Sequence, residues 1–206
     1  MAWNPLEHLR PVPQKPINKL PRVLNKTPFP YAFTGGYAVQ HYIAERDCYR
    51  LDFLTETQHR EIVQQFFKKH SRHTDKYADT HDFYILKRSK IYIGVINSPA
   101  DWVTSAINQA QDNNKVLPLQ WLILAKMWTG DRQDFLDSAR LIARAKENDF
   151  DQIKAIFEEY LPEALPELRE LYKIGIAELK QNPDYQNKPN SYSAWHKMNA
   201  EVNTEE

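Results

Sequence analysis

Short runs of apolar and alternating residues in the first half of the chain predict β-strands. The clearest run is 49–54, in which Leu51 and Phe53 alternate with Arg50 and Asp52. The other predicted strands are 31–34, 82–87 and 91–96. Residues 88–90 form a short polar link between the last two, so we expect a β-hairpin there.

Apolar residues at helical spacing predict helices in both halves of the chain. We expect a helix over 37–44, directly after Gly35 and Gly36 end the first strand. Thr55 is expected to cap a second helix that runs to about residue 70, with Gln58 placed for a capping box. The second half predicts four more helices: one beginning at Pro118 and broken by Gly130, one over 132–146, one opened by Asp149 or Asp151, and one over 166–179.

These elements predict an α+β fold with a small mixed sheet, followed by an α-helical unit. The boundary is expected near residues 112–117. We predict four segments: a proline-rich arm at 1–30, an α+β core at 31–114, a helical unit at 115–181 and a flexible tail at 182–206. Trp195 stands out in the otherwise polar tail and is a candidate to dock back onto the protein.

The charges cancel over the whole chain but not locally. The formal net charge is +0, which by itself favours neither a nucleic-acid nor a membrane partner. A basic region could still attract a phosphate-rich ligand, although a solvated surface is the alternative interpretation. Its residues are Lys68, Lys69, Arg72, Lys76, Lys87, Arg88 and Lys90.

The cysteine count and the apolar runs limit the class of protein further. Cys48 is the single cysteine, which excludes an intrachain disulfide framework and a thiolate zinc cluster. No apolar run approaches the roughly 20 residues that span a bilayer, and the N-terminus lacks the apolar core of a signal peptide. We therefore expect a soluble, cytoplasmic protein without a membrane partner.

The first candidate for chemistry is the turn at Gly35 and Gly36 between the predicted strand and helix. Glycine lets a phosphate approach the backbone closely, and the N-terminus of a helix presents N–H groups that no residue of the helix accepts. A simple tight turn is the alternative interpretation of the same pair.

Two groups of residues resemble the nucleotidyltransferase (polymerase-β-like) superfamily, and within it the AbiEii/AbiGii toxin group. The first group follows the pattern G-G-x-A, a helix, then R-x-[ST]-x-D-[IL]-D-[FL]. It is matched here by Gly35, Gly36, Ala38, Arg46, Leu51, Asp52 and Phe53, with Cys48 at the Ser/Thr position. The second group is Lys126, Arg132, Asp134 and Asp137, which fall where that group has a lysine and then an arginine with aspartates.

The resemblance implies a function as well as a fold. An NTP would be the ligand, Asp52 would bind Mg²⁺, and Asp52 and Lys126 would be catalytic. The implied nucleotide-binding residues are Gly35, Gly36, Arg46, Arg50, Lys126, Arg132, Asp134 and Asp137. The resemblance also implies a bacterial toxin–antitoxin or phage-defence system, with RNA or an antitoxin-like protein as partner.

The chain departs from that pattern at the metal ligands. Arg50 stands where the family has the first carboxylate of D-x-D, and Tyr92 where a third acid is expected. Arginine is a cationic donor and cannot ligate a metal, but it could take the metal's place and bind phosphate, or pair with Asp52. Asp79, His81 and Asp82 offer other ligands, although solvation in a loop is the expected role.

Three functions therefore stay open from the sequence. The first is nucleotidyl transfer to an RNA, protein or small-molecule hydroxyl. The second is a catalytically inactive binding or regulatory protein that keeps the phosphate pocket. In the third, the motifs only pack within the fold.

Overall fold

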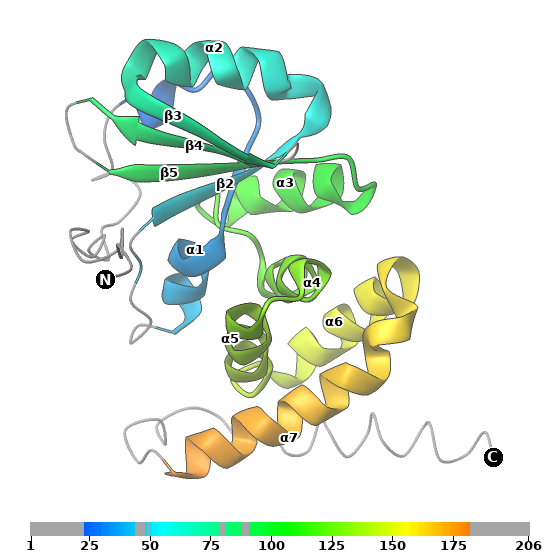
Figure 1. The fold of residues 1–206 in the computed structure, drawn as a ribbon. Helices are drawn as coiled ribbons and strands as arrows, with labels where there is room; N and C mark the ends of the chain where they lie inside the picture. Colours follow the sequence, from blue (N-terminus) through cyan, green and yellow to red (C-terminus); the bar gives the residue numbers. More distant parts are fainter. Residues whose placement is uncertain (1–22, 44–47, 49, 79–80, 88–90, 182–206) are drawn as a thin grey trace. The chain divides into compact units, whose positions relative to one another are not determined.

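The computed structural model describes residues 23–43, 48, 50–78, 81–87 and 91–181 (Figure 1). The chain divides into two compact units, Met1–Pro118 and Leu119–Glu206, and each unit is described by itself. Most of the predicted proline-rich arm and the whole predicted tail lie outside the described residues. No helix in the described part is long and apolar enough to cross a membrane.

The first unit is built on a mixed sheet with the strand order β1-β2-β5-β4-β3. β2 pairs antiparallel with β1 and parallel with β5, whereas β4 is antiparallel to both β5 and β3. The strands are β1 (Ala32–Thr34), β2 (Arg50–Glu56), β3 (Ser71–Ala78), β4 (His81–Leu86) and β5 (Tyr92–Ser98). The predicted α+β class and the predicted hairpin of β4 and β5 are confirmed.

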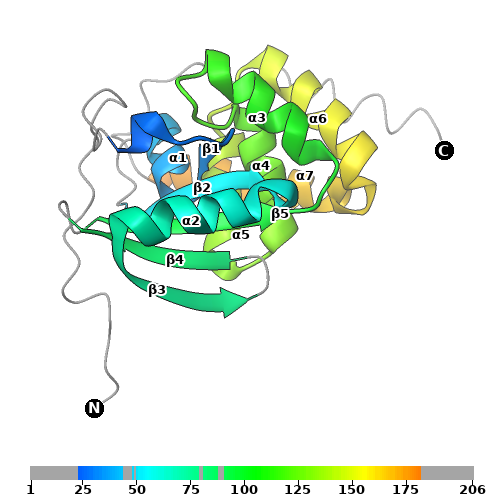
Figure 2. The same ribbon diagram turned by 90° about the horizontal axis from the view of Figure 1, so that it is seen from above.

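Alternation along β2 places Leu51 and Phe53 on one face of the sheet and Arg50 and Asp52 on the other. Leu51 and Phe53 are fully buried. Phe53 meets Phe67 of α2 (Arg60–His70) with ring centroids 5.9 Å apart, and Phe67 stacks on Tyr84 of β4 at 4.6 Å. Figures 1 and 2 show α2 lying across this face, with α1 (Gly35–Tyr42) on the other side of the sheet. Arg50 and Asp52 alternate with these core residues and so lie on the face opposite α2.

The predicted cap at Thr55 is wrong. Parallel pairing of β2 with β5 continues to Glu56 and Ser98, so Thr55 belongs to the strand. Its side chain is buried, and Oγ1 donates a hydrogen bond to the Pro30 carbonyl at 3.0 Å. A short 3-10 turn, Thr57–His59, precedes α2.

One strand and one α-helix of the first unit have no counterpart in the sequence prediction. β3 is polar and lies at the edge of the sheet, where it pairs with β4 alone, so it carries no apolar alternation. The helix α3 (Trp102–Asp112) buries five residues at helical spacing within a mainly polar segment. They are Trp102, Val103, Ala106, Ile107 and Ala110.

The second unit is helical in its described part. Its helices are α4 (Leu119–Thr129), α5 (Arg132–Ile142), α6 (Glu147–Tyr160) and α7 (Leu165–Gln181). α5 ends at Ile142, a turn earlier than the predicted end at 146. Gly175 lets α7 approach α5 closely, because a Cβ there would overlap the Ala139 carbonyl oxygen.

Candidate functional site

The turn from β1 into α1 is the first part of the candidate site. Gly35 is the first residue of α1 and has φ +60°, which favours glycine over residues with a side chain. Thr34 precedes it in extended conformation, and its side chain makes no cap hydrogen bond to the helix. Gly35 also lies against Asp52, since a Cβ on Gly35 would overlap Oδ2 of that carboxylate.

Asp52 is held between Gly35 at the start of α1 and Gly94 of β5. The register places Thr34 of β1 and Gly94 of β5 on either side of Asp52. A Cβ on Gly94 would overlap Oδ1 of Asp52, just as one on Gly35 would overlap Oδ2. Asp52 is 5% exposed. The two missing side chains therefore leave room for this carboxylate within the fold.

Arg50 covers the carboxylate from the solvent side. Its Nε lies 2.5 Å from Asp52 Oδ1 and its Nη2 lies 3.3 Å from Oδ2, so the two side chains form a bidentate pair. The guanidinium carbon stands 4.9 Å from the centre of the Phe83 ring. The Arg50 side chain is nevertheless 46% exposed, and Nη1 has no hydrogen-bond partner among the described residues.

The register places the two substituted positions of the family pattern beside each other. Arg50 on β2 is the direct neighbour of Tyr92 on β5. The positions at which the resemblance implies carboxylates therefore adjoin, and the chain fills them with a cation and a phenol. Of the carboxylates in that pattern, only Asp52 remains here.

The residues present do not fit a two-metal site. Both oxygens of Asp52 accept hydrogen bonds from Arg50. No group of three His, Cys, Asp or Glu side chains that could hold a metal ion occurs among the described residues. Hard divalent cations require such oxygen ligands, so no step through Mg²⁺ follows from this arrangement.

Asp82 does not replace the missing carboxylates, because it faces the other side of the sheet. It is buried, and its Oδ2 accepts hydrogen bonds from Gln64 of α2 and Asn97 of β5, each at 3.3 Å. The expectation that Asp82 is a solvated loop residue is therefore wrong. Asp79 and Arg46 lie outside the described residues.

His81 shares its face with Phe83 and Asp52 and responds to the site's charges. Burial lowers the pKa of His81, and the Arg50 guanidinium lowers that pKa further, whereas Asp52 and Asp82 act in the opposite direction. The net shift is downward, so the neutral imidazole is favoured.

Three of the four residues of the second predicted group, Lys126, Asp134 and Asp137, form an ionic cluster in the helical unit. Lys126 of α4 is 6% exposed. Its Nζ pairs with Asp134 and lies 3.0 Å from Oδ2 of the fully buried Asp137, both on α5. Gln133 donates to Asp137 and Thr129 donates to Asp134. Burial alone would lower the pKa of Lys126, but the two carboxylates together raise it.

This cluster changes the interpretation of Lys126 and Arg132. One cation with two carboxylates carries a net charge of −1, which does not attract a phosphate. Both aspartates pair with Lys126. Arg132 is exposed and lies at an apolar hollow in the same unit. The structure thus groups Lys126, Asp134 and Asp137 and leaves Arg132 apart from them.

Gly94 and Phe83 also belong to the candidate site, although the sequence does not predict them as site residues. Gly94 is recognisable only when its register against Asp52 is known. Phe83 pairs with Gly94 across β4 and β5, which brings its ring beneath the guanidinium.

Comparison with known proteins adds no family to these observations, because neither a family model nor a curated protein matches the chain.

Proposed function

We propose that this chain is a nucleotidyltransferase-fold protein that binds a nucleotide or another phosphate-bearing ligand, with Arg50 in the place of a metal ion. The observation that carries the proposal is the Arg50–Asp52 pair. One edge of the guanidinium is fixed by the carboxylate, and the Nη1 end is still available in a half-exposed side chain. A guanidinium fixed in this way is suited to bidentate recognition of phosphate oxygens.

The arrangement around Asp52 supports the same proposal. The chain runs from β1 through the glycine turn into α1, and β2 then returns antiparallel to β1 and brings Asp52 against Gly35. The N-terminus of α1 therefore lies next to the carboxylate that anchors Arg50. Helix N-termini and guanidinium groups both favour anions.

Nucleotide-monophosphate transfer is less well supported than binding. Two-metal phosphoryl transfer needs ligands that place metal ions on the attacking and leaving oxygens. Arg50 is donor-only, and Asp82 is on the opposite face of the sheet. We therefore infer a catalytically inactive binding or regulatory component, which the resemblance connects to a toxin–antitoxin or phage-defence system.

A thermal-shift titration distinguishes the two functions. ATP and pyrophosphate are added to the full chain in EDTA and, separately, in MgCl₂. The proposal predicts a concentration-dependent rise in Tm of similar size in both buffers, because ligand binding to the folded state stabilises it. Stabilisation that requires Mg²⁺, together with consumption of ATP, would instead support nucleotidyl transfer.

A further inference from the structure

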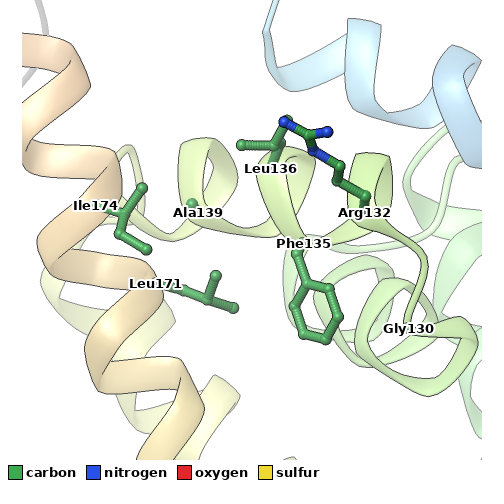
Figure 3. A pocket seen from close by; sticks show the side chains of 7 residues that line it. All are labelled: Gly130, Arg132, Phe135, Leu136, Ala139, Leu171 and Ile174. Carbon is green, nitrogen blue, oxygen red and sulfur yellow. The ribbon is translucent and has the colours of Figure 1, made fainter.

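The helical unit carries an apolar hollow between α5 and α7 that the proposed phosphate site does not use. The hollow has a volume of about 380 Å³ and an almost entirely apolar lining. Figure 3 shows Leu171 and Ile174 projecting from α7 toward the side of α5 that carries Phe135. The remaining lining residues are Gly130, Arg132, Leu136 and Ala139.

Two side chains of the hollow are unusually exposed for their type. Leu136 on α5 is 38% exposed and Ile174 on α7 is 50% exposed. They lie on adjacent helices and border the same concave surface, so they form a continuous apolar patch and not scattered surface residues. Covering such a patch removes apolar area from water and stabilises the protein.

We infer that the chain's own C-terminal segment, residues 191–206, covers this hollow, with Trp195 as the anchor. α7 itself lines the hollow and ends at Gln181, seven residues after Ile174. Fourteen further residues lead to Trp195, and they span up to roughly 46 Å when extended. The segment therefore reaches the hollow from the helix that borders it.

The sequence of this segment carries apolar residues at helical spacing, which suits an apolar hollow. Trp195, Met198 and Val202 follow one another at spacings of three and four within a polar stretch, so they share one face in a helical conformation. An indole side chain buries a large apolar area for few rotatable bonds. Covalent attachment also gives the segment an effective concentration of the order of millimolar at the hollow.

Charge complementarity favours the same occupant. Arg132 lies at the hollow, is exposed and makes no ion pair with the described residues. Residues 191–206 hold three acids, Glu201, Glu205 and Glu206, all on the C-terminal side of Trp195, against one fixed cation, Lys197. A segment that carries apolar residues and a net negative charge thus matches an apolar hollow beside a guanidinium. The inference does not depend on the phosphate site of the other unit.

Fluorine NMR of the full chain labelled with 5-fluorotryptophan tests this inference. The chain has five tryptophans, and Trp195→Phe assigns the Trp195 resonance. We expect that resonance to be protected from a soluble paramagnetic probe. Trp128, which is 50% exposed, serves as the accessible reference. A Trp195 resonance as accessible as that of Trp128 would overturn the inference.

Matched substitutions locate the docking surface. Ile174→Asp should expose the Trp195 resonance, whereas Lys173→Asp should not, because Lys173 is exposed and lies outside the hollow. If Ile174→Asp unfolds the chain, Met198→Asp provides the test from the segment's side and should expose Trp195 equally. Protection that is lost on dilution would assign the hollow to a second copy of the chain and contradict the intramolecular contact.

Discussion

Gly94 of β5 lies so close to Asp52 of β2 that a single methyl group at Gly94 would overlap the carboxylate. The carboxylate in turn fixes the Arg50 guanidinium. The candidate site therefore requires a residue without a side chain at position 94. Gly94 makes room for the Asp52 carboxylate, and that carboxylate orients the Arg50 guanidinium.

Gly94→Ala should destabilise the first unit by roughly 1–3 kcal/mol, the usual cost of overpacking a filled interior. Urea denaturation measures the change. In the double variant Gly94→Ala/Asp52→Ala the overlapping carboxylate is absent, so the alanine at position 94 should cost less than it does beside Asp52. Equal costs in the two backgrounds would show that Asp52 does not lie against Gly94.

Lys126→Met should lower the free energy of unfolding by roughly 3–5 kcal/mol, because it leaves two carboxylates in the helical unit without their cation. Lys173→Met is the matched control, since Lys173 pairs with Glu170 on the surface and such pairs contribute about 0–1 kcal/mol. Unchanged stability combined with lost ATP affinity would instead support a phosphate-binding role for Lys126.

His81 should make stability depend on pH near neutrality. The folded-state pKa of His81 is below its ordinary value of 6.5, so the unfolded chain binds the proton more tightly. The contribution of neutral His81 to the free energy of unfolding is therefore fully present above about pH 6.5. It is lost as the pH falls through the lowered pKa of His81 in the folded state. Urea denaturation between pH 7.5 and 5.5 should show this loss, and His81→Gln should reduce the slope. An unchanged slope would contradict the shift.

Arg50→Asp should convert the site from a metal-free one to one that binds a divalent cation. The change places a second carboxylate beside Asp52 and removes the guanidinium that occupies its oxygens. Mn²⁺ titration followed by electron paramagnetic resonance should detect binding to this variant, and adding Asp52→Asn should abolish the binding. Wild-type protein that binds Mn²⁺ as tightly as the variant would contradict the role given to Arg50.

The parts of the fold that sequence predicts are those with strong local patterns. Alternation around Leu51 and Phe53 predicted β2, and helical spacing after Pro118 predicted the helical unit. The edge strand β3 is polar in sequence and has no such pattern, and its pairing with β4 is a contact that no local pattern contains. The sequence predicts a cap at Thr55 because a cap is a local feature, whereas the pairing with Asn97 that keeps Thr55 in β2 joins residues far apart in the chain.

The same distinction applies to the candidate site. Arg50 and Asp52 are two residues apart in a strand, so their pairing on one face was a foreseeable alternative. The contact of Gly94 with Asp52 depends on the register of β2 and β5, and the ion pairs of Lys126 depend on the packing of α4 against α5. Neither can be predicted from the local spacing of residues.

The central claim is that Arg50 binds phosphate without a metal, and isothermal titration calorimetry of ATP in EDTA tests it most directly. Arg60 is the matched control, since it is a partly exposed arginine near Asp82 on the opposite face of the sheet. We predict that wild type and Arg60→Gln bind ATP in EDTA. Arg50→Gln should bind at least about tenfold more weakly, as expected for one lost hydrogen bond to a charged group. Equal affinity of Arg50→Gln and wild type, or binding of ATP by wild type only when Mg²⁺ is added, would contradict the account.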